Sequence, residues 1–196
     1  MVENGEYEVI YTSGINPVYQ SDKEILQMLE QEFRAQEKRV EAVYFYGAGC
    51  AFPEKNEQVR LALKDFFTAP QVEIASDLLA AARSLFQHSS GIVCILGTGS
   101  NSCYYDGKDI VGNVPPLGFI LGDEGSGAVM GKRLVADVLK GILPGKLRES
   151  FFKEYRCTYP EIIDRVYRQP LPNRFLASFT PFLKKYIAYP EIENIV

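Results

Sequence analysis

The span of residues 91–126 constrains the fold more than any other part of this sequence. It opens with the apolar run Ile-Val-Cys-Ile-Leu at residues 92–96, which predicts a buried strand because it is β-branched and too short for a helix. The run stops at Gly97, and residues 97–102 then bring two glycines, two serines, a threonine and an asparagine together. A turn of this composition lets the backbone approach a ligand closely, and its successive amides can form an anion-binding nest.

The residues after this turn decide which phosphate-binding motifs remain open. Asp106-Gly107 lies between two strand-like segments and is a strong hairpin signal, so the glycine-rich turn is expected to join two strands. A dinucleotide fingerprint needs a third glycine and a helix directly after the turn, and the sequence has neither. A Walker A loop is nearly spelled at residues 126–133, but Ser126 replaces its first glycine and Arg133 replaces the hydroxyl residue that holds the metal.

Two adjacent carboxylates, Asp123 and Glu124, precede a predicted helix over residues 129–142. Acidic residues are favoured at the positive end of a helix, so helix capping alone is one explanation for them. Capping does not require the four glycines that surround them, and we therefore favour a ligand-facing role. These glycines are Gly118, Gly122, Gly125 and Gly127.

The combination GTGSN at residues 97–101 and PLGFILGDEGSG at residues 116–127 resembles the N-acetylglucosamine kinase and BadF/BadG ATPase group of the sugar kinase, Hsp70 and actin superfamily. GTGSN is similar to that group's second phosphate-binding hairpin, and GDEGS is similar to its sugar-pocket loop. The resemblance extends more loosely from about residue 14 to about residue 141. It implies ATP and Mg²⁺ as cofactors, with the Mg²⁺ carried mainly by the nucleotide and no metal ligand assigned to the protein.

The resemblance also implies roles for individual residues. Asp77 would be the catalytic base, since it precedes the GTG turn by about the interval found in the kinases. The ATP phosphates would contact Gly97, Thr98, Gly99 and Ser100. The sugar would contact Asn16, Asn101, Pro116, Leu117, Gly118, Asp123 and Glu124. Leu117 stands where characterised animal members have a tryptophan, so the identity of the sugar stays open.

Two of these residues have a purely structural alternative in the sequence itself. Asn16 precedes Pro17, which is a common turn-forming pair. Asp77 follows a predicted strand at residues 72–75 and precedes a predicted helix at residues 78–86, so either Ser76 or Asp77 could be the N-cap. The same position at the carboxyl end of a strand suits chemistry in an open α/β sheet.

Composition limits the partners of the chain. Its 196 residues carry a net charge of −4 with no block of lysines and arginines, which argues against nucleic acid. The start lacks a signal-peptide pattern, and no apolar run reaches the roughly 18 residues of a membrane span. The four cysteines are scattered, Cys94 is expected in the core, and a reduced cytoplasmic setting fits best. Small-molecule sugar and ATP are the expected partners, and a homodimer is left open.

The expected fold is α/β with a ribonuclease H-like actin and sugar kinase architecture, incomplete, with a helical C-terminal portion. Residues 1–100 are assigned to the remainder of an N-terminal domain and residues 101–196 to the first part of a C-terminal domain. A strand is expected over residues 7–12, and its hairpin partner across Asn4-Gly5 would lie before Met1. Further elements are expected at residues 22–33, 41–46, 54–67, 146–155, 161–168 and 174–187.

The function expected from these features is an ATP-dependent sugar kinase, acting on an amino sugar such as N-acetylglucosamine, with residues 1–196 inactive on their own. Two alternatives stay open. One is a fragment that binds sugar without turnover, and the other is a BadF-type ATPase that activates a dehydratase. The second alternative predicts an iron–sulfur cluster held by paired cysteines, for which the sequence shows no pattern.

Overall fold

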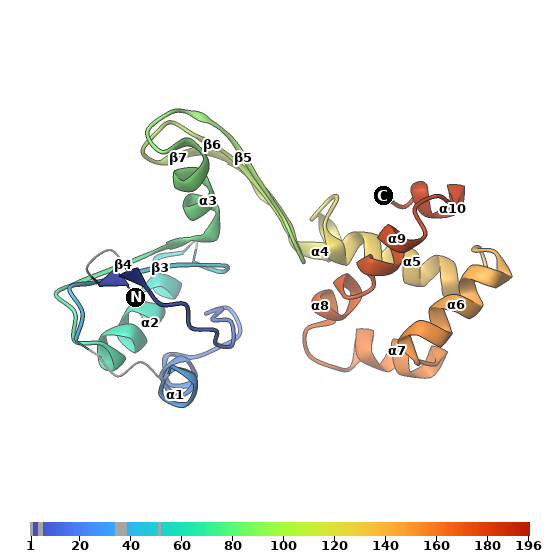
Figure 1. The fold of residues 1–196 in the computed structure, drawn as a ribbon, viewed down its shortest axis with the longest axis horizontal. Coiled ribbons are helices and arrows are strands. Elements are labelled where there is room, and N and C mark those ends of the chain that lie inside the picture. The colour runs from blue at the N-terminus through green and yellow to red at the C-terminus, as the bar shows by residue number, and fades with distance from the viewer. Residues whose placement is uncertain (1, 4–5, 34–38, 51) are drawn as a thin grey trace. The chain divides into compact units, whose positions relative to one another are not determined.

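The computed structural model describes residues 2–3, 6–33, 39–50 and 52–196 (Figure 1). The chain forms two compact units, Met1–His88 and Ser89–Val196, which are described separately below. Both contain helices and strands, so the mixed α/β class is confirmed. The expected domain boundary at residue 100 stays a prediction.

The described residues of the first unit form two short sheets and three helices. Its elements in chain order are β1 (Val2–Glu3), β2 (Glu6–Tyr7), α1 (Asp22–Glu32), β3 (Ala42–Gly47), α2 (Pro53–Phe66), β4 (Gln71–Ser76) and α3 (Asp77–Phe86). Strands β3 and β4 are parallel, in a register that runs from Ala42 opposite Gln71 to Gly47 opposite Ser76. Helix α2 connects them, as a parallel pair requires. Both strands therefore end at the same edge of the sheet.

Helices α1 and α2 pack their apolar faces together to form the core of this unit. Ile25 and Leu29 of α1 and Val59 and Leu63 of α2 are buried in one cluster with Ile74 of β4. Helix α1 begins at a capping box, in which the Glu24 amide donates to Ser21 Oγ and the Ser21 amide donates to Glu24 Oε2. The helix predicted at residues 22–33 is confirmed, with Ser21 as its N-cap.

The second unit begins with a three-stranded antiparallel sheet and continues as helices. Its elements are β5 (Gly91–Leu96), β6 (Ser100–Tyr105), β7 (Ile110–Val114), α4 (Gly118–Leu121), α5 (Gly127–Leu139), α6 (Gly145–Tyr155), α7 (Tyr159–Tyr167), α8 (Pro172–Ala177), α9 (Thr180–Lys185) and α10 (Pro190–Glu193). The glycine turn joins β5 to β6, and Asp106–Asp109 joins β6 to β7, as predicted. Apolar side chains of α5 to α10 form the core, including Leu134, Phe151, Ile162, Phe182 and Ile192.

Four expectations about these elements were wrong. The strand at the start of the chain covers only Glu6–Tyr7, and its partner is Val2–Glu3 rather than a segment before Met1. The expected turn at Asn4-Gly5 lies outside the described residues. The helix predicted over residues 174–187 is broken into α8 and α9, because Pro181 lacks the amide that would continue a helix and lies in the first turn of α9.

The other two errors concern burial in β5. Only Val93 of the predicted buried run is buried, while Ile92 and Leu96 are 73% and 72% exposed. Cys94 is exposed rather than part of the core, because alternate side chains of a strand point to opposite faces and Val93 takes the covered one.

In the part of the chain that the structure describes, no helix is long and apolar enough to span a membrane.

Candidate functional site

The glycine turn at residues 97–99 is tied to the start of helix α5 by its carbonyl groups. The Gly127 amide donates to the Gly97 carbonyl at 2.8 Å, and the Ala128 amide donates to the Thr98 carbonyl at 3.0 Å. The Val129 amide donates to Ser126 Oγ, and the Ser126 amide donates to the Asp123 carbonyl. The amides at the start of α5 are thus satisfied within the protein, and this helix end offers no free donors to a ligand.

The same hydrogen bonds fix the direction of the turn's own amides. All peptide bonds of the described chain are trans, so each N–H points opposite to the carbonyl of the same peptide group. Because the Gly97 and Thr98 carbonyls point toward α5, the Thr98 and Gly99 amides point away from it. Neither amide donates a hydrogen bond within the described residues. The two peptide groups continue the dipole direction of α5 and present two adjacent donors, an arrangement that suits an anion.

The side chain of Asp123 lies against this turn at Gly99. The residue is only 9% exposed, and within the described residues its carboxylate accepts no hydrogen bond and forms no ion pair. A Cβ atom placed on Gly99 would lie 2.9 Å from Asp123 Oδ2 and 3.3 Å from its Cγ. The carboxylate oxygens still reach the surface of the protein, so this group is a candidate for binding the hydroxyl or amide donors of a ligand.

The loop that holds Asp123 has an unusual backbone. Leu117 and Asp123 both have a positive φ, 60° and 57°, and neighbouring Gly118 and Gly125 do as well. Aspartate visits this region readily, but for leucine it is strained. The Asp123 amide donates to the Pro116 carbonyl at 2.9 Å, which closes the loop on itself. Strain of this kind is maintained where surrounding contacts enforce it, and it gathers at functional sites.

Two other predicted sugar contacts in this unit, Asn101 and Glu124, have surroundings that differ from those of Asp123. Asn101 Oδ1 accepts hydrogen bonds from the Asn113 side chain and from the Ser102 backbone amide, both at 2.9 Å. The side-chain oxygen of Asn101 therefore has a role within the sheet. Glu124 is exposed, in contrast to the buried Asp123. Neither has a described contact with the Asp123 carboxylate. The side chains of the acidic pair do not cap α5, because Ser126 is its N-cap. The ligand-facing role of the pair stays a prediction.

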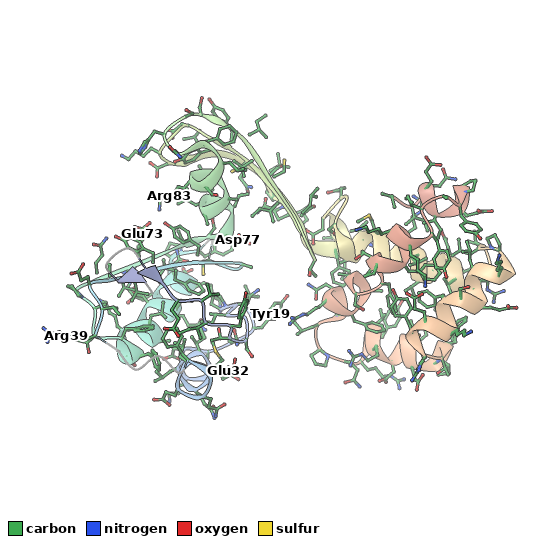
Figure 2. The ribbon with its side chains drawn as sticks, in the orientation of Figure 1. Tyr19, Glu32, Arg39, Glu73, Asp77 and Arg83 are labelled. Carbon is green, nitrogen blue, oxygen red and sulfur yellow. The ribbon has the colours of Figure 1, made fainter. Side chains whose placement is uncertain are left out.

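In the first unit, Asp77 occupies the first position of α3, where β4 ends (Figure 2). Ser76 is the N-cap, since its Oγ accepts a hydrogen bond from the Leu79 amide at 3.2 Å. Asp77 is half-buried, and within the described residues its carboxylate accepts only a hydrogen bond from the Leu78 amide, at 2.8 Å. The capping role that the sequence left open for Asp77 is therefore taken by its neighbour, and a second carboxylate oxygen stays available.

Asn16 lies near the end of the neighbouring strand, β3. A Cβ atom on Gly49 would meet Asn16 Oδ1, so the side chain of Asn16 occupies the space that this glycine leaves. Asn16 Oδ1 accepts a hydrogen bond from the Val18 amide at 3.0 Å, which confirms its turn-forming role. Its side-chain nitrogen donates no hydrogen bond within the described residues. The turn role and a ligand role therefore use different atoms.

Cys50 is a neighbour of Asp77 that the sequence pattern did not single out. It is buried at the end of the turn after β3, and its pKa is raised first by burial and then by the negative charge of Asp77. The thiol is therefore held in its neutral form beside the carboxylate. Ser126 was also missed, although a serine directly before Gly-Ala-Val has the form of an N-cap.

Comparisons with solved structures agree with the prediction that the chain is related to sugar kinases. No family model matches the chain, and no curated protein matches it either. A solved structure described as a putative N-acetylglucosamine kinase from Porphyromonas gingivalis shares 47% identity over 95% of this chain and 67% of its own, with a TM-score of 0.90. A second, described in the same words and from Chromobacterium violaceum, shares 21% identity over 88% of this chain and 62% of its own, with a TM-score of 0.63.

The two matches carry different weight. The Chromobacterium violaceum structure supports the fold alone, because its identity to this chain is low. The Porphyromonas gingivalis structure is similar in sequence and in fold, and this close match supports a sugar kinase function. The chain spans about two thirds of that protein. We conclude that this chain belongs to the same family as the N-acetylglucosamine kinase homologue of Porphyromonas gingivalis.

Proposed function

We propose that this protein acts as an ATP-dependent kinase of an amino sugar, with N-acetylglucosamine as the first candidate, on a ribonuclease H-like fold of the actin and sugar kinase type. The observation that carries this proposal is the orientation of the glycine turn. The Gly97 and Thr98 carbonyls are bonded to α5, and the Thr98 and Gly99 amides point away from α5 and donate no hydrogen bond to any described residue. A kinase relative implies the use of ATP, and these amides suit its phosphate oxygens.

The turn would act mainly by position and charge. In phosphoryl transfer the protein contributes little covalent chemistry, and most of the catalysis comes from orientation and electrostatic stabilisation. The Thr98 and Gly99 amides would donate to phosphate oxygens, and the Thr98 and Ser100 hydroxyls would add further donors. The positive end of α5 would act through the same peptide groups, which lie in line with it.

Asp77 would be the catalytic base. The proton of the attacking sugar hydroxyl would pass to a carboxylate oxygen of Asp77, the hydroxyl oxygen would bond to the γ-phosphorus, and ADP would leave. The free oxygen of Asp77 fits this role, because the other oxygen accepts the Leu78 amide. The side-chain nitrogen of Asn16 and the carboxylate of Asp123 would bind the sugar, with Asn101, Pro116, Leu117, Gly118 and Glu124 as further contacts.

Mg²⁺ would travel with the nucleotide. Within the described residues, no three acidic, histidine or cysteine side chains gather to hold a metal ion. Mg²⁺ is commonly bound through one or two carboxylates together with substrate phosphates and water, so such a cluster is not required.

The test is the substitution Asp77→Asn, assayed with radiolabelled ATP and a panel of hexoses and N-acetylhexosamines. Loss of a general base should lower the turnover number by about 100-fold or more while sugar binding stays within a few-fold. Asp65→Asn is the matched control, because Asp65 is an exposed aspartate of α2 in the same unit. Turnover that persists within a few-fold in Asp77→Asn would remove Asp77 from the mechanism.

The same assay separates the two other functions that the sequence left open. A chain that binds a sugar in calorimetry but transfers no phosphate to it would be a binding protein. A chain that hydrolyses ATP without any sugar, and that shows the visible absorption of an iron–sulfur cluster, would be the dehydratase-activating ATPase.

A further inference from the structure

Gly99 has no conformational need to be glycine. Its φ lies outside the left-handed region, so an alanine could adopt the same backbone. The usual explanation for a glycine in a phosphate turn is that the backbone must come close to the ligand. The contacts of Gly99 within the protein offer a different explanation.

The space beside the Gly99 Cα is filled by the carboxylate of Asp123. A Cβ atom on Gly99 would lie 2.9 Å from Oδ2, 3.3 Å from Cγ and 3.4 Å from Oδ1, so every atom of the carboxylate group is within contact range. The carboxylate is at the end of a short side chain, and Asp123 as a whole residue is 9% exposed. The backbone of Asp123 is held at both ends, by its amide to the Pro116 carbonyl and by its carbonyl to the Ser126 amide. The backbone of Asp123 is therefore fixed, and the carboxylate can avoid a Cβ atom at position 99 only by rotating about its own side-chain bonds, out of its present position.

We propose that Gly99 is a positioning residue for the sugar site, which holds the Asp123 carboxylate in place by leaving room for it. One side of Gly99 presents its amide to the phosphate, and the other side borders the carboxylate that binds the sugar. This inference rests on the proposed function for the role of Asp123. The glycine turn thereby positions the groups that bind both substrates. A methyl group on Gly99 displaces the Asp123 carboxylate, which contacts the sugar, and leaves the Gly99 amide, which donates to the phosphate, in place.

Gly99→Ala tests the proposal, with Gly112→Ala as the matched control. The control makes the same change in strand β7 of the same sheet, away from the residues assigned to either substrate, and its Cβ would meet only Tyr104 Cβ, at an ordinary contact distance of 3.6 Å. Gly99→Ala should raise the KM for N-acetylglucosamine about 10-fold or more, because a displaced contact of a few tenths of an ångström to 1 Å weakens productive binding. The KM for ATP should change by less than about threefold.

A double-mutant cycle with Asp123→Ala supplies the decisive readout. Gly99→Ala should lower the melting temperature when Asp123 is present and have no effect when the side chain at 123 is alanine, because the clash is then gone. If Gly99→Ala alone does not fold, the double variant should fold. A rise in the KM for ATP instead of the sugar, or an equal loss of stability in both backgrounds, would overturn the proposal.

The outcomes also separate this inference from the proposed function. If neither the wild type nor the variants bind or phosphorylate N-acetylglucosamine or the other sugars of the panel, the proposed function fails, whereas the stability cycle still measures the contact. If Asp123→Ala abolishes sugar binding and Gly99→Ala does not weaken it, the proposed function stands and the positioning role of Gly99 is wrong.

Discussion

Glycine and a polar side chain share space at two places in this protein. In the first unit Gly49 leaves room for Asn16, and in the second unit Gly99 leaves room for Asp123. Both polar residues are predicted sugar contacts. At Gly99 the absence of a side chain is therefore explained by a neighbouring side chain, and close approach of a ligand is not needed to account for it. At Gly49 the backbone φ of 82° calls for glycine as well. In each case the glycine fixes a polar group that belongs to another segment.

The reactivity of the four cysteines should differ strongly. Cys94 is exposed, while Cys50 and Cys103 are buried, and burial is the main cause that raises the pKa of both buried thiols. The reactive species is the thiolate, so Cys94 should be alkylated by iodoacetamide at pH 8 about 10-fold faster or more. Peptide mass spectrometry over time measures the rates, and the urea-unfolded chain is the control, in which the four should react alike. Equal rates for Cys50 and Cys94 in the folded protein would contradict the burial of Cys50.

At the scale of elements, the two helices that follow candidate residues have their own caps. Ser76 caps α3 and Ser126 caps α5, in each case through its Oγ. The adjacent carboxylates of Asp77 and Asp123 are therefore not needed for capping. Because the serine Oγ accepts a hydrogen bond from a backbone amide of the first helical turn, the carboxylate of the nearby aspartate stays available for chemistry.

Helix α5 packs closely on α8, and a glycine makes this possible. A Cβ atom on Gly131 would collide with the Leu176 carbonyl group, which is backbone and cannot turn aside. Gly131→Ala should therefore force the two helices apart and lower the free energy of unfolding by about 1–3 kcal/mol. Urea denaturation followed by circular dichroism measures this change.

The control for this variant is Gly145→Ala at the start of α6. Its Cβ would meet nothing within 4 Å, and the position is helical, so this substitution should be neutral or stabilise by up to about 1 kcal/mol. If both alanines gave the same stability, the close packing of α5 on α8 would be incorrect.

Predictions from the sequence were correct for elements whose signals are local. They were wrong or missing for features that depend on a contact with a distant segment. The Asp106-Gly107 hairpin and the helix over residues 22–33 depend on signals from neighbouring residues, and both were predicted correctly. The burial of Asp123 and its contact with Gly99 join residues 24 positions apart, and no local pattern reports them. The break before Pro181 was local and was missed, because the apolar spacing of residues 174–187 looked continuous.

At the scale of the whole molecule, the candidate residues are divided between two units that each have a core. Asn16 and Asp77 belong to Met1–His88, whereas the glycine turn and Asp123 belong to Ser89–Val196. Each unit buries its own hydrophobic cluster, built around Ile25 and Val59 in the first and Leu134 and Phe151 in the second. Stability measurements on the chain therefore report on both units, and groups that respond to pH occur in each.

Acid should destabilise the protein through four carboxylates whose pKa is lowered by hydrogen bonds. Glu24 and Glu32 accept hydrogen bonds from Ser21 and Ser13, Glu161 accepts from Thr158, and Asp106 accepts from the amides of Lys108 and Asp109. The unfolded chain takes up protons near the ordinary values, 4.5 for glutamate and 3.8 for aspartate, and the folded chain does so only at lower pH. The unfolded state thus binds more protons below these values, and stability falls as the pH falls.

The melting temperature should accordingly decrease as the pH is lowered from about 5 to about 3, whereas these four groups add no pH dependence between about 6 and 7. Scanning calorimetry across this range measures the slope. In Glu161→Gln one of the titrating groups is gone, while glutamine can still take part in the capping box with Thr158, so the decrease should be shallower. A melting temperature that stayed constant or rose between pH 5 and pH 3 would show that these hydrogen bonds do not hold the carboxylates ionised in solution.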